Sequence, residues 1–261
     1  MKLYAEMINL DRARDRRELM RAELARAGIS AEFFPAFDFK EHSADEVARY
    51  CRDEGPWGAF ARSHQACTIS HSLAWERFLE SDADIALIME DDIHIAPETG
   101  EWLRDLSWWP TDADMVKLER WNDERVRVLL ENGGVSHMGR EVRKMLTRHM
   151  GAAGYMLNRR AAQALLDSRP FDMVIDHILF NMNASRAARA LNIYQIVPAL
   201  VRQGNEPQDT VAYMQLPEGI GGLAKLKREI RRGLYELALP ASTWVKFLTR
   251  RARLHRIPYR E

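Results

Sequence analysis

Three consecutive carboxylates follow an apolar run that ends at Met89: Glu90, Asp91 and Asp92. A continuous apolar run is typical of a central strand covered on both faces. Side chains alternate along a strand, so Glu90 and Asp92 are expected on one face and Asp91 on the other. Open α/β sheets bind ligands at the carboxyl ends of strands, and adjacent carboxylates repel unless a cation lies among them. The pattern predicts a Mn²⁺ or Mg²⁺ site, with a solvated acidic turn as the alternative.

A basic segment follows the first predicted strand. It consists of Asn9, Leu10, Asp11 and Arg12, with further arginines at positions 14, 16 and 17. A basic loop at a strand end suits a phosphate or a nucleotide, whereas a salt-bridged helix start is the alternative. The chain has no Gly-x-x-x-x-Gly-Lys-Ser/Thr motif, and no Gly-x-Gly-x-x-Gly after this strand. A phosphate-binding loop of either kind is therefore not expected.

Two further polar groups lie in predicted helices. Ser70 and His71 are expected to line a site beside the acidic strand. Cys67 and His71, four residues apart, would supply half of a zinc site, but their spacing matches no common zinc pattern. A small buried hydrophobic role is the alternative for Cys67. Asp176 and His177 lie in apolar company, where an aspartate is costly unless it caps the helix or is functional.

Four tryptophans surround the segment after the carboxylates, and their role is open. Aromatic rings form platforms for sugar faces, whereas core packing is the alternative. The four are Trp102, Trp108, Trp109 and Trp121.

The positions of apolar residues predict alternating strands and helices. Strands are expected over residues 2–10, 31–37, 83–89, 115–118, 154–157 and 193–197. Helices are expected over residues 11–27, 63–81, 159–166 and 172–183. Asp11 is a candidate N-cap of the first helix, and Gly28 a candidate stop. The initial strand–helix–strand order indicates a parallel sheet.

Composition excludes several classes of protein. The 261 residues are 46% hydrophobic, and no stretch approaches the ~18 consecutive apolar residues of a membrane-spanning helix. A disordered chain and a multi-span membrane protein are therefore excluded. Two cysteines, Cys51 and Cys67, suit a reducing compartment. The first residues lack the apolar segment of a secretory signal, so a cytoplasmic location is expected.

The zero net charge hides an uneven distribution. Residues 223–261 contain 11 basic and three acidic residues, a charge of +8, so the preceding residues carry −8. Apolar residues interleave with these arginines, and one or two basic amphipathic helices are expected. Such a tail would bind an anionic membrane surface. Nucleic-acid binding is the competing interpretation, but the acidic remainder of the chain opposes it. Residues 204–222, rich in glycine, are expected to be a linker after a domain of residues 1–203.

Several segments, taken in order, resemble glycosyltransferase family 25, the bacterial lipooligosaccharide glycosyltransferases related to collagen galactosyltransferases. The stronger matches are residues 8–12 (INLDR), 15–17 (DRR), 34–38 (FPAFD), 66–75 (ACTISHSLAW) and 86–92 (ALIMEDD). Weaker ones are residues 116–118 (VKL), 154–157 (GYML), 174–177 (VIDH) and 197–200 (VPAL). The resemblance covers about residues 3–203 and excludes the basic tail.

The resemblance implies an α/β fold with a GT-A-like, Rossmann-type mixed sheet flanked by helices, followed here by a basic helical tail. It also implies transfer of a hexose from a nucleotide-diphospho-sugar to a saccharide acceptor of lipooligosaccharide, with inversion. By this analogy residues 90–92 correspond to the metal-binding acidic motif of the family, and residues 9–12 approach the nucleotide. We hypothesise that Asp92, assisted by Glu90 or Asp91 and with His177 completing the shell, binds Mn²⁺ or Mg²⁺. Asp176 is the expected base, with Asp91 in reserve. Residues that would bind the donor, a UDP-sugar, are Asn9, Leu10, Asp11, Arg12, Arg16, Ser70 and His71.

Two other functions fit the same residues. A metal-dependent phosphohydrolase would use the same acidic strand on nucleotide substrates. A membrane-associated adaptor without catalytic activity would carry these carboxylates at its surface and bind no nucleotide. The preferred hypothesis places a transferase on the inner face of the cytoplasmic membrane, where lipid-linked saccharides are its acceptors.

Overall fold

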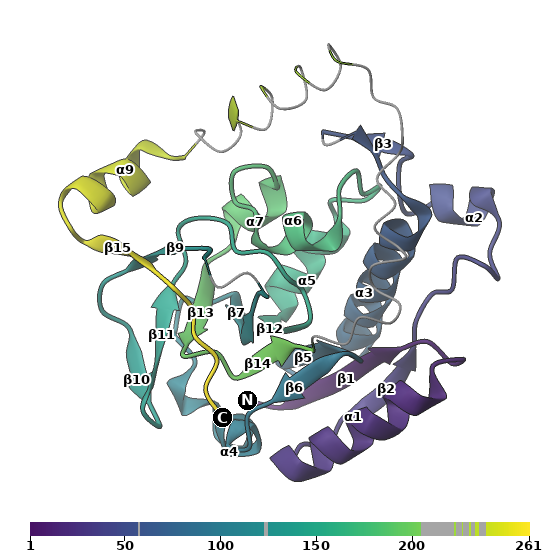
Figure 1. Cartoon of the computed structure of the whole chain (residues 1–261), viewed down its shortest axis with the longest axis horizontal. Helices are drawn as coiled ribbons and strands as arrows, with labels where there is room; N and C mark the ends of the chain where they lie inside the picture. The colour runs from purple at the N-terminus through teal and green to yellow at the C-terminus, as the bar shows by residue number, and fades with distance from the viewer. Residues whose placement is uncertain are drawn as a thin grey trace.

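The computed structural model describes residues 1–56, 58–122, 125–204 and 239–261, together with residues 222, 226, 230, 233 and 234. An eight-stranded mixed sheet forms its centre, in the order β10-β11-β13-β7-β12-β5-β1-β2. Helices lie on both sides of the sheet (Figure 1). The predicted α/β class, a Rossmann-type mixed sheet flanked by helices, is confirmed.

Three neighbouring strands at one end of the large sheet run parallel to one another. β1 (Leu3–Asn9) pairs with β2 (Glu32–Pro35) on one side and with β5 (Ile85–Glu90) on the other. The register places Ile8 beside both Phe34 and Glu90. These three strands consequently end at the same edge of the sheet, as the strand–helix–strand pattern predicts.

The remaining strands complete the large sheet. Next to β5 come β12 (Gly154–Asn158), antiparallel to it, then β7 (Met115–Lys117) and β13 (Ile193–Val197), followed by β11 (Arg140–Lys144) and β10 (Val135–His137). A smaller sheet joins β6 (Ile93–Ile95), β14 (Val201–Gln203) and β8 (Glu119–Arg120). A short hairpin pairs β3 (Glu54–Gly55) with β4 (Gly58–Ala59).

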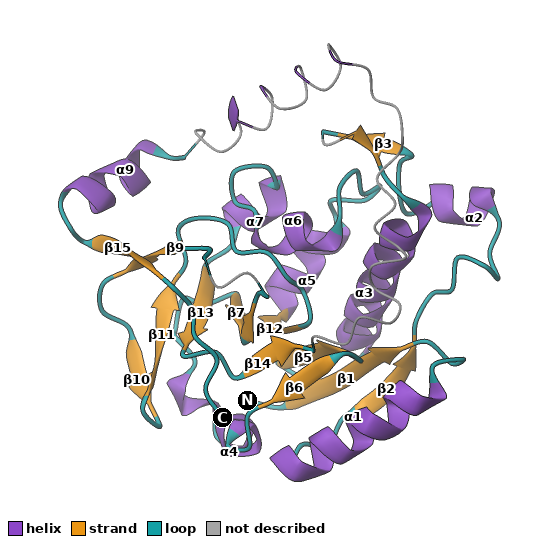
Figure 2. Ribbon diagram, viewed as in Figure 1, coloured by secondary structure: helices purple, strands orange, loops and turns teal. Residues whose placement is uncertain are grey.

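Alternate side chains of β5 enter two separate hydrophobic cores. Ala86 and Ile88 belong to the core that includes α3 (Arg62–Glu80), α5 (Arg159–Leu166), α6 (Ile175–Phe180) and α7 (Arg186–Ala190). Leu87 and Met89 belong to the core under α1 (Arg14–Ala27) and α4 (Thr99–Arg104). The predicted burial of this strand on both faces is confirmed. Figure 2 shows α1 and α3 on opposite sides of β1.

Two predicted helices have different bounds. α1 begins at Arg14 after the N-cap Ala13, which makes no side-chain cap, so the prediction of Asp11 as N-cap is wrong. Asp11 instead pairs with Arg17. Gly28 ends the helix in the left-handed conformation, as predicted. The helix expected over residues 172–183 is shorter and spans Ile175–Phe180. A further short helix, α2 (Ala44–Ala48), begins at a capping box made by Ser43 and Glu46.

The C-terminal segment combines a helix with a strand. α9 (Ala241–Leu248) agrees with the expected basic helix, but Ala252–His255 forms the strand β15, which pairs with β9 (Val128–Glu131). The prediction of a helical tail is therefore wrong for β15, because pairing with β9 supplies backbone hydrogen bonds that local periodicity does not reveal. The expected linker lies outside the described residues, apart from its two ends.

The last residues of the chain pack on the main body. Ile257 is buried, and the backbone N–H of Ala199 donates to the carbonyl of Pro258 at 2.7 Å. The fully buried guanidinium of Arg140 donates to the carbonyl of Arg260 at 2.8 Å. In Figure 1 this yellow chain end passes β9 and β13 and terminates near α4.

Candidate active site

A cavity of about 470 Å³ lies at the carboxyl ends of β1, β2 and β5. Residues after β1 and β2 form one wall, and α3 and the start of α6 form the other. The three carboxylates at the end of β5 lie between these walls, and the turn of residues 150–152 completes the lining. This is the position at which open α/β sheets bind their ligands.

Asp91 is held by polar partners from β1 and α1. Its Oδ2 accepts a hydrogen bond from Asn9 Nδ2 at 2.6 Å, and its Oδ1 lies 3.0 Å from Arg16 Nη1. Asn9 in turn accepts from Arg17 Nε at 2.7 Å. Burial raises the pKa of Asp91, and Arg16 and Asn9 oppose that rise. Because both oxygens are already engaged, Asp91 is poorly suited to accept a proton from a substrate.

Glu90 faces the opposite wall. Its Oε1 lies 3.0 Å from His71 Nε2 and 3.8 Å from Cys67 Sγ, both on α3. Burial, followed by the negative charges of Asp176 and Asp91, raises the pKa of Glu90 to about 8. Burial also lowers the pKa of His71 to about 3, so the imidazole is neutral at physiological pH. The α3 wall therefore gives Glu90 neutral hydrogen-bond partners and no compensating cation.

Asp92 lies in the turn after β5. Gln203 Nε2 on β14 donates to its Oδ2 at 3.3 Å, whereas its Oδ1 is buried without a hydrogen-bond partner among the described residues. Burial, followed by the charges of Glu90 and Asp91, raises the pKa of Asp92 to about 7. An unsatisfied carboxylate oxygen beside other carboxylates, all lining one cavity, fits a hard divalent cation.

Asp176 lies in the first turn of α6 and also lines the cavity. Its Oδ2 accepts a hydrogen bond of 3.0 Å from the backbone N–H of Gly151. After burial, its negative charge is the next cause of the raised pKa of Glu90. Asp176 is thus an acceptor at the cavity wall, oriented by the neighbouring turn.

A buried ion pair behind the cavity supports that turn. Lys117 is fully buried, and its ammonium donates to the carbonyls of His149, Met150 and Gly151. It lies 3.5 Å from Glu119, which accepts from the backbone N–H of Ala153 at 2.9 Å. Burial raises the pKa of Glu119 to about 8. The pair fixes the turn whose N–H orients Asp176.

Sequence reasoning missed Lys117, Glu119, Gly151 and Gln203. A lysine inside the apolar segment 115–118 was the available signal, because a charged residue in a buried strand requires partners. No local pattern marks Gly151, which has a φ of +90°. A Cβ at this position would overlap the Glu119 carboxylate. That restriction exists only in the folded chain.

The structure brings most of the predicted site residues to the cavity. The lining includes Leu10, Arg12, Arg16, Ser70, His71, Glu90, Asp91, Asp92 and Asp176. Arg12 forms an ion pair with Asp38, and Ser70 accepts a hydrogen bond from the backbone N–H of Phe37 at 2.9 Å. Each therefore has a supporting contact within the wall.

Three predicted site residues do not line the cavity. Asn9 lies behind Asp91, and Asp11 is an exposed partner of Arg17. His177 is buried, with its Nδ1 2.6 Å from Asn181 Nδ2, and is not part of the lining. For His177 the physical reason is helical geometry. Consecutive helical residues such as Asp176 and His177 point in directions about 100° apart, so only one of the two can face the cavity.

Among the four tryptophans, only Trp121 lines the cavity. Trp102 and Trp108 are buried against each other in the core under α4, with ring centroids 4.9 Å apart. Trp109 packs against that same core. Core packing, the alternative to a sugar platform, is therefore the outcome for these three.

The fold and this cavity define a class: an α/β protein with a Rossmann-type sheet and an acidic cavity at the strand ends. Residues 5–179 match the sequence profile of glycosyltransferase family 25, described as LPS biosynthesis proteins. The chain belongs to this family.

Individual relatives are distant in sequence. Lipooligosaccharide biosynthesis protein lic2B of Haemophilus influenzae is 24% identical, over 80% of each chain. Lacto-N-neotetraose biosynthesis glycosyltransferase LgtB of Neisseria meningitidis serogroup B is 23% identical, over 94% of this chain and 90% of the relative. Alignments to two other relatives span 61% and 59% of those proteins. A solved glycosyltransferase involved in glycosylation of the major capsid of PBCV-1 has a TM-score of 0.40, with 9% identity, over 89% of this chain and all of that one.

Proposed function

We propose that this protein transfers a hexose, such as galactose or glucose, from a UDP-sugar to a saccharide acceptor of a lipooligosaccharide. Membership of glycosyltransferase family 25 supports sugar transfer, and the relatives' names indicate the kind of acceptor. The observation that carries the proposal is the acidic cavity at the strand ends, in which the buried Oδ1 of Asp92 has no partner among the described residues. A GT-A-type fold is part of this proposal.

The residues at the end of β5 fit a Mn²⁺ or Mg²⁺ ion. Asp92 would hold it, with Glu90 as the second carboxylate, because both residues line this cavity and the pKa of each is raised by burial and then by negative neighbours. The bound ion would supply positive charge to stabilise the leaving diphosphate. His177 is not included among these ligands, because it does not line the cavity.

Asp176 is the proposed general base. It is fixed by the Gly151 N–H through one oxygen, while its carboxylate borders the same cavity as the acidic strand end. The acceptor hydroxyl would give its proton to Asp176 as its oxygen bonds to the anomeric carbon, and the bond from that carbon to the diphosphate would break. A single displacement of this kind inverts the configuration of the sugar.

The wall formed by the residues after β1 and β2 would bind the nucleotide. Arg12 and Arg16 line the cavity with side chains about two-fifths exposed, so both can approach a phosphate while they retain Asp38 and Asp91 as partners. Ser70 supports Phe37, whose ring lies against His42 with centroids 3.9 Å apart. These contacts give the donor wall a fixed shape before a ligand enters.

The test of the proposed function is UDP binding with and without Mn²⁺, measured by calorimetry. We expect Mn²⁺ to tighten UDP binding in the wild-type protein, and Asp92→Asn to remove this effect while the fold is retained. Equal UDP affinity with and without Mn²⁺ would exclude the metal role. UDP-sugar turnover then separates transferase from phosphohydrolase, since rapid hydrolysis without an acceptor indicates the latter.

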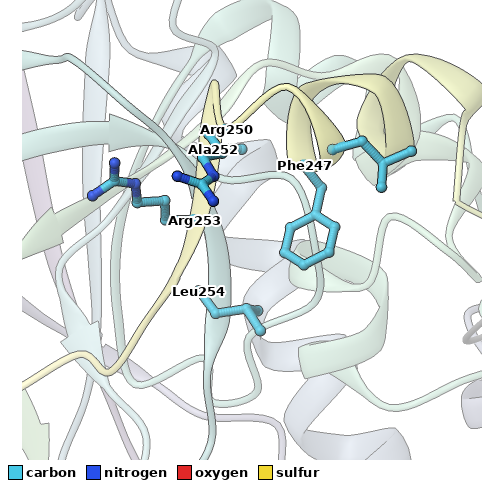
Figure 3. A pocket seen from close by; sticks show the side chains of 6 residues that line it. Phe247, Arg250, Ala252, Arg253 and Leu254 are labelled. Atoms are coloured by element: carbon cyan, nitrogen blue, oxygen red, sulfur yellow. The ribbon is translucent and has the colours of Figure 1, made fainter.

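The C-terminal segment supports a second part of the proposal, binding to an anionic membrane surface on the cytoplasmic side. Phe247 of α9 and Leu254 of β15 are exposed apolar side chains, and Arg250 and Arg253 line the same hollow (Figure 3). Leu248 of α9 is also exposed. Apolar groups flanked by arginines are typical of interfacial membrane contacts. No helix among the described residues is long and apolar enough to cross a membrane.

Point substitutions test this surface better than truncation, because β15 and the residues after it pack on the main body. We expect Phe247→Ser with Leu248→Ser to reduce sedimentation with vesicles containing anionic lipid, and Leu19→Ser, an exposed position on α1, to leave it unchanged. Unchanged sedimentation of the double variant would exclude this surface as the membrane contact.

A further inference from the structure

Three potential metal ligands of mixed type meet on the α3 side of the cavity. Cys67 and His71 lie four residues apart on α3, and Glu90 ends β5. The sulfur, one ring nitrogen and one carboxylate oxygen all lie within 4.8 Å of one another. All three residues line the cavity, so an ion could reach them from solvent. Nothing in the proposed transfer reaction uses the thiol.

Two of the separations between these atoms are close to those of a tetrahedral zinc site. Zinc lies about 2.3 Å from sulfur and about 2.0–2.2 Å from nitrogen or oxygen, which places ligand atoms roughly 3.4–3.6 Å apart. The observed separations are 3.0 Å from His71 Nε2 to Glu90 Oε1 and 3.8 Å from Cys67 Sγ to the same oxygen. Three protein ligands and a cavity-facing fourth position are the arrangement of an open zinc site.

Groups behind the site already orient the histidine. His71 Nδ1 lies 2.9 Å from Tyr155 Oη, and Tyr155 Oη accepts a hydrogen bond of 2.8 Å from Trp75 Nε1. Histidines that ligate metals use one ring nitrogen and bind a polar partner through the other. Nδ1 has such a partner in Tyr155, which leaves Nε2 directed at the other two ligands.

We propose that Cys67, His71 and Glu90 form a binding site for Zn²⁺ or another thiophilic divalent cation. Sulfur and nitrogen ligands favour Zn²⁺ over Mn²⁺, whereas the Asp92 side of the cavity offers oxygen ligands. The thiol proton is released to solvent when the ion binds. The two sites share Glu90, so zinc would withdraw this carboxylate from the Mn²⁺ ion. This last consequence rests on the proposed function, but zinc binding itself does not.

Cobalt substitution tests the site directly, since Co²⁺ bound to a thiolate has an intense charge-transfer absorption. The metal-free full-length protein would be titrated with Co²⁺ alone. We expect the band in the wild type and in Cys51→Ser, because Cys51 is buried elsewhere, beside Gln65. We expect no band in Cys67→Ser. Absence of the band in the wild type, or its loss in Cys51→Ser, would overturn the proposal without depending on any activity.

Zinc affinity, measured by competition with a chromophoric chelator, gives a second readout. We expect Cys67→Ser and His71→Asn each to weaken Zn²⁺ binding by at least ~100-fold, and Cys51→Ser to change it less than about 2-fold. Circular dichroism would show that each variant is folded. Unchanged zinc affinity in folded Cys67→Ser would refute the site.

Asp92→Asn separates this site from the proposed manganese site. The variant should keep the Co²⁺ charge-transfer band and lose Mn²⁺-dependent UDP binding. In the wild type, added Zn²⁺ should reduce Mn²⁺-dependent UDP binding, and in Cys67→Ser this inhibition should disappear. If Asp92→Asn abolished the cobalt band, the ligands would not be the three named here. If the wild type showed the cobalt band but no effect of Mn²⁺ on UDP binding, the proposed metal role of Asp92 would fail and the zinc site would stand.

Discussion

The carboxylates on the two walls of the cavity have different kinds of partner. On the α1 side, Asp91 and Asp38 each form an ion pair with an arginine, Arg16 and Arg12 respectively. On the α3 and α6 side, Glu90 and Asp176 contact a neutral imidazole and a backbone N–H. Within the described residues, neither forms an ion pair with an arginine or lysine. Carboxylates on the first wall are neutralised by the protein itself, and those on the second are not.

Because their partners differ, two adjacent residues, Asp91 and Asp92, are suited to different roles. Asp91 and Asp92 are neighbours in the sequence, yet Asp91 engages both oxygens and Asp92 keeps one buried oxygen without a partner among the described residues. A neutralised carboxylate is suited to fix the shape of a binding wall. A carboxylate without a counter-charge is suited to bind a cation or to accept a proton.

The largest expected effect concerns the wall that lacks cations. Asp176→Asn should lower kcat by about 10²–10⁴-fold, the usual contribution of a general base, while UDP binding with Mn²⁺ changes little. Asp38→Asn is the matched control on the other wall and should alter donor binding more than kcat. Steady-state kinetics and calorimetry would measure both. Normal turnover in Asp176→Asn would remove it as the base.

The turn that orients Asp176 should be intolerant of a side chain. Gly151→Ala should destabilise the fold by about 2 kcal/mol more than Gly133→Ala, measured by urea unfolding. Both glycines have a left-handed φ, of +90° and +80°, but only at position 151 would a Cβ overlap the Glu119 carboxylate. Equal losses in the two variants would show that strain in the backbone, and not this close contact, explains the glycine.

On the α1 side of the cavity, where the carboxylates are neutralised by arginines, a substitution should act by changing the shape of the binding wall. Asp91→Asn should weaken UDP binding about tenfold, or about 1.4 kcal/mol, because Arg16 loses its charged partner and its position. The loss should be the same with and without Mn²⁺, unlike that in Asp92→Asn. A calorimetric comparison of the two variants decides the point. If Asp91→Asn abolished the Mn²⁺ effect, the distinction between the walls would be wrong.

The smallest effect is a pH dependence of stability that comes from His71. Its pKa is about 3 in the folded protein and 6.5 in the reference state, so the unfolded chain binds a proton first as pH falls. The histidine therefore favours the native state above pH ~6.5, and this contribution is lost progressively below it. When the pH falls from about 7.5 to 5.8, the free energy of unfolding of the wild type should decrease by about 1 kcal/mol more than that of His71→Gln. Parallel pH profiles in urea unfolding would contradict this.

The sequence predicted six of the eight strands of the large sheet and the helices α1, α3, α5 and α6, because the relevant signals are local. An uninterrupted apolar run predicted that β5 is buried on both faces, and Gly28 predicted the end of α1. β15 was missed because its pairing with β9 joins residues more than 100 positions apart. An amphipathic basic segment contains no information about such a partner.

For the site, the sequence by itself determined which carboxylates gather at the end of β5, because strand ends and charge runs are visible in the order of residues. Only the tertiary structure decided what each carboxylate touches. Asn9 and Arg16 reach Asp91 from β1 and α1, and Lys117 orients Asp176 through a turn that is distant in sequence. Charge compensation depends on distances of a few ångströms between separate elements, and these distances exist only after the chain has folded.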